Sequence, residues 1–240
     1  MSAFGRIQGG AETVIESLKA LVGPEGLVVM PAFPIDGTGR EHLSRDPLFD
    51  VRNTPSTMGA ITEAFRKRKD VFRSLHPTHS VCAWGSRAEE FVAGHEQAAT
   101  PFGEGTPFAR LVEQNALQVW FGCRLWAITL YHAFECLQPS FPIRVFSDST
   151  FAARCRNASG EPVIVHTPVH DPRLAPYRID RRPDLEARFK LRLIQEGALQ
   201  SLRLGKGEIM AARARPLFAA FERLLAEGLT IYALPTGRGE

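Results

Sequence analysis

The start of the chain limits which folds it can adopt. Residues 11–22 place apolar side chains at helical spacing, and the glycines and proline of residues 23–26 end that pattern. The apolar run Leu27–Met30, rich in β-branched residues, follows at once between Gly26 and Pro31, which is typical of a strand buried on both faces. An amphipathic helix followed directly by a buried strand predicts an α/β fold.

The pattern changes in the C-terminal half. Two short β-like runs, residues 143–146 and 163–166, are joined by the turn-forming Asn157-Ala158-Ser159-Gly160, which predicts an antiparallel hairpin. We expect one domain over residues 1–240, with an α/β core in about 1–140 and the hairpin with a helical portion in about 141–234. Further elements are expected as strands at 117–122 and within 202–210, and as helices at 129–137, 182–195 and 216–225.

Composition excludes several classes of function. The 29 basic and 26 acidic residues are spread along the chain without a basic stripe, so no nucleic-acid partner is expected. Residues 1–10 lack the pattern of a secretory signal, and no apolar run is long enough to cross a membrane. We therefore expect a cytoplasmic protein without a membrane partner. No glycine-rich motif for a dinucleotide or a P-loop is found.

Two histidines have the spacing of a metal-ligand pair. His76 and His79 lie in His-Pro-Thr-His, but Pro77 prevents a normal helical turn, and no nearby Cys or Glu completes a ligand set. The four cysteines are far apart and form no CxxC pair, so reduced thiols are expected rather than a zinc site. The sequence therefore predicts no metal.

His132 is the third histidine of interest. A neutral imidazole is well suited to take a proton from an attacking amine near neutral pH, and acyl transfer needs such a base. Glu135 follows three residues later and could hydrogen-bond to His132 within one helical turn. Two interpretations stay open from the residues alone: a packed histidine with an exposed glutamate, or a catalytic base with its carboxylate.

Several segments, taken in order, resemble the aminoglycoside 3-N-acetyltransferase family. The most specific are Arg-Ser-Leu-His-Pro-Thr-His-Ser-Val at 73–81, Thr-Pro-Phe-Gly-Glu-Gly-Thr-Pro-Phe at 100–108 and Thr-Leu-Tyr-His-Ala-Phe-Glu at 129–135. Residues 9–14, 23–31, 53–66 and 94–96 add to the match. The resemblance covers nearly the whole chain.

The resemblance implies a fold and an activity. The fold would be a central mixed sheet flanked by helices, with a groove that accepts CoA and an amine from opposite sides. The activity would be transfer of acetyl from acetyl-CoA, as co-substrate, to the 3-amino group of an aminoglycoside or to a related amine. The alternative is a degenerate member that binds CoA or another ligand without useful turnover. The partner is then a small-molecule amine, and a homodimer stays open.

The resemblance also assigns roles to single residues. His132 would be the general base, with His79 beside it among the catalytic candidates and Glu135 holding the local structure. A carboxylate behind the base would be Asp148. The segment Thr57, Met58 and Gly59 would lie near the pantetheine arm of CoA, and the loop with Ser74, His76 and Ser80 would line the site near the thioester.

Three departures from the family pattern carry expectations of their own. The family begins with a strand ending in His-Ser-Ser before the segment matched by residues 2–5, so we expect this chain to be truncated at its N-terminus and to lack that strand. Before Thr129 the family usually has polar residues, whereas this sequence has Trp126 and Ile128. Arg124 stands where a small residue is usual. A different choice of amine is expected.

Overall fold

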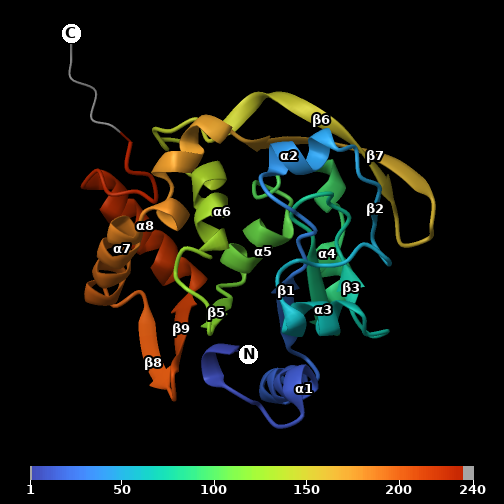
Figure 1. Cartoon of the computed structure of the whole chain (residues 1–240), viewed down its shortest axis with the longest axis horizontal. Coiled ribbons are helices and arrows are strands. Elements are labelled where there is room, and N and C mark those ends of the chain that lie inside the picture. The colour runs from blue at the N-terminus through green and yellow to red at the C-terminus, as the bar shows by residue number, and fades with distance from the viewer. Residues whose placement is uncertain (1, 235–240) are drawn as a thin grey trace.

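The computed structural model describes residues 2–234 and has the α/β fold predicted from the sequence (Figure 1). Helix α1 and strand β1 lie where the opening pattern placed them. The described helices are α1 (Gly10–Val22), α2 (Gly39–Ser44), α3 (Ala60–Arg66), α4 (Ala88–Val92), α5 (Pro107–Glu113), α6 (Thr129–Leu137), α7 (Pro183–Gln195) and α8 (Ala214–Ala226), with 3-10 turns at Ser2–Phe4, His95–Gln97, Pro172–Tyr177 and Ile179–Arg181.

A single central mixed sheet was expected, and this part of the prediction is wrong for the described residues. Their strands form three separate three-stranded sheets, in the orders β1-β4-β3, β2-β6-β7 and β5-β9-β8. Only the pair β2/β6 is parallel. The strands are β1 (Leu27–Pro31), β2 (Phe49–Asp50), β3 (Phe72–Arg73), β4 (Val81–Gly85), β5 (Leu117–Phe121), β6 (Phe146–Arg156), β7 (Pro162–His170), β8 (Gln200–Leu204) and β9 (Gly207–Arg213).

Strand β1 is covered on both faces, as a strand inside a larger sheet would be. Val28 and Met30 pack on the α1 and α3 side, while Leu27 and Val29 contact the core on the other side. Both faces are thus covered, as the apolar run indicated, but β1 achieves this in a short antiparallel sheet with β4.

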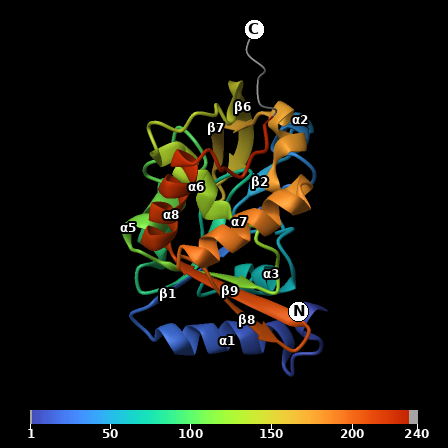
Figure 2. The same cartoon turned by 90° about the vertical axis from the view of Figure 1, so that its left-hand side faces the viewer.

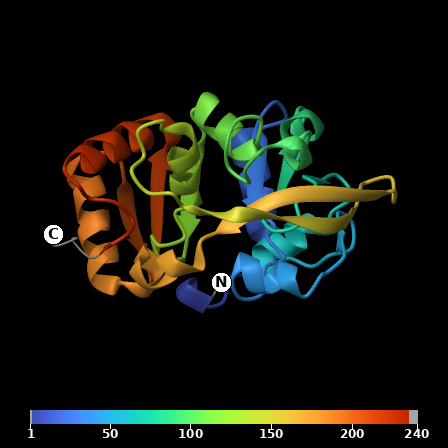
Figure 3. The same cartoon turned by 90° about the horizontal axis from the view of Figure 1, so that it is seen from above.

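The predicted hairpin is confirmed and is longer than expected. Strands β6 and β7 run from the middle of the molecule over the side that contains α2 and β2, which Figures 1 and 3 show from two directions. The register changes near the start of β6: Phe146 pairs with His170, but Thr150 pairs with Pro168. Strand β6 therefore carries extra residues there, and such a bulge turns the neighbouring side chains in new directions.

Helix α6 lies between the two largest cores. Tyr131 and Phe134 join the core formed by α7, α8 and one face of the β5-β9-β8 sheet, and Figure 2 shows α7 and α8 against that sheet. Leu130 and Ala133 join the core beneath β1 and β4. Because the helix has 3.6 residues per turn, burying these two stripes leaves a third stripe for polar side chains, and His132 lies on it.

The last described residues return to the middle of the molecule. The backbone N–H of Ile179 donates to the carbonyl of Ile231 at 2.8 Å, and that of Ala233 donates to Tyr177 at 2.9 Å. Tyr232 is held between these two bonds and pairs with Arg178 in an isolated bridge. Within residues 2–234, no helix is both long and apolar enough to cross a bilayer.

Candidate active site

His132 and Glu135 form a hydrogen-bonded pair on the polar stripe of α6. The Nδ1 atom of His132 lies 2.8 Å from Oε2 of Glu135, one helical turn away. The Glu135 side chain is fully buried, and 14% of the His132 side chain is exposed. The glutamate is therefore not the exposed surface group of the first interpretation.

The electrostatic surroundings keep Glu135 ionised. Burial acts to raise the pKa of its carboxyl group, but the charge and hydrogen bond of His132 outweigh this and lower the pKa to about 2. The hydroxyl of Tyr232 donates to Oε1 of Glu135 at 2.9 Å. An ionised carboxylate only accepts, so in the neutral form of His132 the proton is on Nδ1 and the lone pair is on Nε2. This is the tautomer that a general base needs.

His170, which sequence reasoning passed over, lies against the same pair. Its ring centroid is 4.5 Å from that of His132, and its Nε2 lies 3.7 Å from Oε2 of Glu135, too far for a hydrogen bond. That Nε2 is buried and has no hydrogen-bond partner among the described residues. Burial, with help from the nearby His132, lowers the pKa of His170 to about 4, so it is neutral near pH 7.

His79 is brought to the same site through Phe102. The ring of Phe102 is fully buried, with its centroid 4.6 Å from that of His79, 5.1 Å from that of His132 and 5.9 Å from that of His170. Burial, reinforced by the neighbouring histidines, holds the pKa of His79 well below its usual value. His79 is thus a neutral, partly buried neighbour of the pair rather than a hydrogen-bonded member of it.

His76 is not available to a ligand. It is 2% exposed, and its Nδ1 accepts from the backbone N–H groups of Thr78 at 3.3 Å and His79 at 3.0 Å. Its other nitrogen therefore carries the proton and donates to the hydroxyl of Thr167 on β7 at 3.3 Å. His76 fixes the loop that carries His79 and ties it to β7.

Ser74 and Ser80 are also internal supports. The hydroxyl of Ser74 accepts from the backbone N–H of Val81 and contacts Nδ1 of His95, both at 2.9 Å. The hydroxyl of Ser80 donates to the carbonyl of Ala32 at 2.8 Å and accepts from the guanidinium of Arg73. Both serines are 1% exposed or less. The polar side-chain atoms of Ser74, His76 and Ser80 are therefore occupied inside the protein, and their contact with CoA stays a prediction.

The segment Thr57, Met58 and Gly59 is exposed, in contrast to that loop. The hydroxyl of Thr57 donates to the carbonyls of Phe33 at 3.1 Å and Ile35 at 3.0 Å. The ring of Phe33 in turn lies edge-on to His79, with centroids 5.0 Å apart. This segment is thus attached to the residues around His79 and is open to a ligand.

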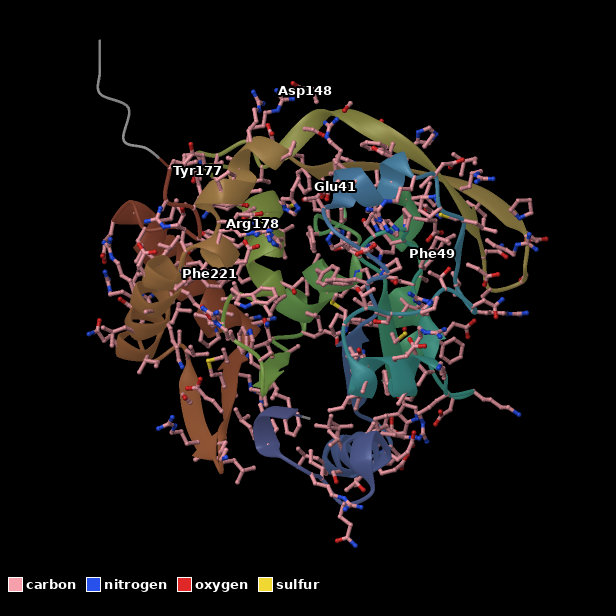
Figure 4. All side chains as sticks on the ribbon, in the orientation of Figure 1. Glu41, Phe49, Asp148, Tyr177, Arg178 and Phe221 are labelled. Atoms are coloured by element: carbon pink, nitrogen blue, oxygen red, sulfur yellow. The ribbon has the colours of Figure 1, made fainter. Side chains whose placement is uncertain are left out.

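Asp148 does not lie behind His132, and its assignment as the orienting carboxylate is wrong. Its side chain is 75% exposed and pairs with Arg144. Figure 4 places it at the outer rim of the β6–β7 hairpin. The carboxylate that orients His132 comes from Glu135 on the same helix.

Comparison with known proteins identifies the family. The model of the aminoglycoside 3-N-acetyltransferase family matches residues 1–226. The chain belongs to this family. Aminoglycoside N(3)-acetyltransferase VII of Streptomyces paromomycinus is 34% identical over an alignment of 152 residues that covers 57% of this chain and 52% of that protein. The chain spans about half the length of the curated relatives that it matches.

A further relative is named only as acetyltransferase-like. The SPbeta prophage-derived aminoglycoside N(3')-acetyltransferase-like protein YokD of Bacillus subtilis (strain 168) is 28% identical over an alignment of 151 residues that covers 56% of this chain and 55% of that protein.

Solved structures share the fold of this family member. The crystal structure of aminoglycoside acetyltransferase AAC(3)-Xa has a TM-score of 0.78 and 26% identity, covering 95% of this chain and 85% of that one. AAC-IIIb in a binary complex with CoASH has a TM-score of 0.75 at 23% identity, covering 98% and 89% of the two chains. A variant of AAC(3)-IVa in complex with a gentamicin has a TM-score of 0.72 at 22% identity, covering 98% and 82%.

Proposed function

We propose that this chain transfers the acetyl group of acetyl-CoA to an amine, and that the acceptor is the 3-amino group of an aminoglycoside. Membership of the family supports the reaction. The named activities of the relatives, and the CoASH and gentamicin bound to two proteins of the same fold, support the two substrates. The alternative, a degenerate member that binds without turnover, is disfavoured by the intact His132–Glu135 pair.

The observation that carries the proposal is the hydrogen bond from Nδ1 of His132 to the buried, ionised Glu135. With its proton at Nδ1, the imidazole offers the Nε2 lone pair to the proton of an attacking amine. The imidazolium that forms is stabilised by the negative charge beside it, in surroundings where few waters weaken that attraction.

The reaction balances without a covalent enzyme intermediate. The amine nitrogen forms a bond to the thioester carbonyl carbon, the carbon–sulfur bond breaks, and CoA leaves as a thiolate. The amine proton passes to Nε2 of His132, from which the thiolate or solvent recovers it. Acetyl-CoA supplies the activated acyl group. None of the described cysteines has to act as a nucleophile, and Cys82 and Cys155 are buried.

The exposed segment before α3 fits the pantetheine arm of CoA. Met58 is 40% exposed and offers an apolar surface. A Cβ at Gly59 would meet no atom within 4 Å, so the backbone there is open to close approach. We infer that Thr57, Met58 and Gly59 contact the arm, while Ser74, His76 and Ser80 hold the loop that positions His79.

We infer that Trp126, and not Ile128, contacts the amine substrate and affects which amine is accepted. Ile128 is 2% exposed and belongs to the core, whereas Trp126 is 45% exposed just before the helix that carries His132. Its backbone N–H donates to Glu186 at 3.2 Å, and Arg124 pairs with the same carboxylate. Of the two apolar departures from the family pattern, Trp126 is the one that a substrate can touch.

The reaction draws on acetyl-CoA, which is consistent with a place in the cytoplasm. We therefore keep the cytoplasmic assignment as part of the proposal. The homodimer stays a prediction.

An assay of thiol release from acetyl-CoA, run against a panel of aminoglycosides, tests the proposal. We expect release that depends on the amine and is lost in His132→Gln. The matched control is His166→Gln, because His166 is exposed on β7 and makes no contact with the pair. Thermal protection by CoA without thiol release on any amine would instead support the degenerate member.

A further inference from the structure

Three ligand-type side chains converge at the catalytic pair. One atom each of His132, Glu135 and His170 lies within 4.8 Å of the other two, and no other such group of three is found among residues 2–234. Two of these residues lie on α6, and the third lies at the end of β7. Two imidazoles and one glutamate form a donor set that zinc uses in proteins, with the fourth position left open.

The separations are close to those that a tetrahedral ion needs. Bonds of about 2.0–2.2 Å place two ligand atoms roughly 3.4 Å apart. Oε2 of Glu135 lies 2.8 Å from Nδ1 of His132 and 3.7 Å from Nε2 of His170, so small side-chain movements suffice. The bond from Tyr232 occupies Oε1 and leaves Oε2 to an ion.

His170 gives the second, independent observation. Its Nε2 is buried without a hydrogen-bond partner among the described residues, although the carboxylate of Glu135 lies 3.7 Å away. A buried polar atom without a partner lowers the stability of the fold, so such atoms call for an explanation. The proposed acetyl transfer gives that nitrogen no task.

We propose that His132, Glu135 and His170 bind one Zn²⁺ per chain and that this ion inhibits the enzyme. The inhibitory part rests on the proposed function. Zinc bonded to Nδ1 of His132 displaces the proton held there, and the neutral ring then takes its proton at Nε2 from solvent. The Nε2 lone pair that accepts the amine proton is thereby lost. The ion is an inhibitor and not a cofactor, so acetyl transfer itself needs no metal.

Zinc binding is measured on the full chain without acetyl-CoA or amine, by competition with a chromophoric chelator and by metal analysis after gel filtration. We expect one ion per wild-type chain. His170→Gln should lower the affinity by at least about 10-fold, since even the loss of a residue that only supports a ligand has an effect of that size. His166→Gln, on the same strand and exposed, should bind zinc as the wild type does.

A second variant keeps the test open if His170→Gln fails to fold. His132→Gln removes a partly exposed ligand of the same cluster and should also lose the ion. The inference is overturned if wild type takes up no zinc at micromolar concentrations, or if the folded variants bind it as wild type does.

Failure of the zinc site and failure of the proposed function can be told apart. If the chain binds no zinc and still releases thiol in excess zinc, the zinc site is refuted and the proposed acetyltransferase activity stands. If the wild-type chain binds zinc, His170→Gln does not, and no thiol is ever released, the zinc site stands and the proposed activity is refuted. If both hold, zinc should suppress wild-type turnover and a chelator should restore it.

Discussion

The rings of His76, His79, His95, His132 and His170 form one histidine cluster. Its two ends differ in what their imidazoles contact. At one end, His76 and His95 stack with centroids 4.5 Å apart, and both nitrogens of each ring contact neutral groups. At the other end, His132 contacts an ionised carboxylate. Its ring is also partly exposed. A buried imidazole with two neutral partners has no reason to change its protonation state, whereas one paired with a carboxylate can accept a proton and stay stabilised.

The comparison separates support from chemistry. The structural end, with His76 and His95, orders the His79 loop, and the catalytic end holds His132, the group that we propose moves a proton. Substitutions at the two ends should therefore affect different measurements, turnover at one and stability at the other.

The largest effect is expected at the catalytic end. His132→Gln should lower kcat by roughly 10²–10⁴-fold, the usual range for a positioned general base, while the protein still folds and binds CoA. Steady-state thiol release measures kcat, and circular dichroism checks the fold. His79→Gln should show a milder defect, since that ring is a neighbour of the pair. If His79→Gln abolishes turnover while His132→Gln keeps it, the base is misassigned.

At the structural end, we expect an effect on protein stability at acidic pH. Burial lowers the pKa of His95 to about 4, compared with 6.5 for a free imidazole. Between these values the unfolded chain binds a proton that the folded chain does not, so the free energy of unfolding should fall as pH drops, by up to about 1.4 kcal/mol per pH unit for this ring. Urea unfolding across this window measures the slope. His95→Gln should flatten it, and an unchanged slope would show that the site is not desolvated.

A smaller effect is expected where CoA is proposed to bind. Met58→Ala removes exposed apolar surface, so the KM for acetyl-CoA should rise by roughly 3- to 10-fold while kcat stays near that of wild type. Leu21→Ala on α1, a far more exposed leucine, serves as the control. A fall in kcat without a change in KM would argue against a binding role.

The smallest effect is expected at Asp148. Its pair with Arg144 is about three-quarters exposed on both sides, and such surface pairs contribute little to stability. Asp148→Asn should leave both kcat and the melting temperature as in wild type. A loss of turnover comparable to that of His132→Gln would restore Asp148 as a catalytic carboxylate.

The sequence predicted the local elements better than their assembly. Helical spacing and breakers located α1, β1 and α6 because those signals are local. The pair on α6 was also within reach, since residues three apart share one helix face. His170 and Tyr232 were not: a bulge in β6 sets the register at His170, and a bridge to Arg178 sets Tyr232. Such long-range geometry leaves no periodic trace in the sequence.

The internal contacts of the loop that carries His76 and His79 could not be predicted, for a related reason. A histidine-rich loop with serines suggests ligand contact, and nothing in the pattern shows that Ser74 and His76 find partners inside the protein. Burial of polar groups depends on which segments meet, as with Ser74 and His95.

A double-mutant cycle tests most directly the central claim that His132 and Glu135 act as one unit. The cycle compares kcat for wild type, His132→Gln, Glu135→Gln and the double variant, each with its fold checked. Once the base is gone, the carboxylate has no imidazolium to stabilise, so the double variant should lie within about 3-fold of His132→Gln. Losses that multiply in the double variant would show that the two residues act independently, and would contradict the account.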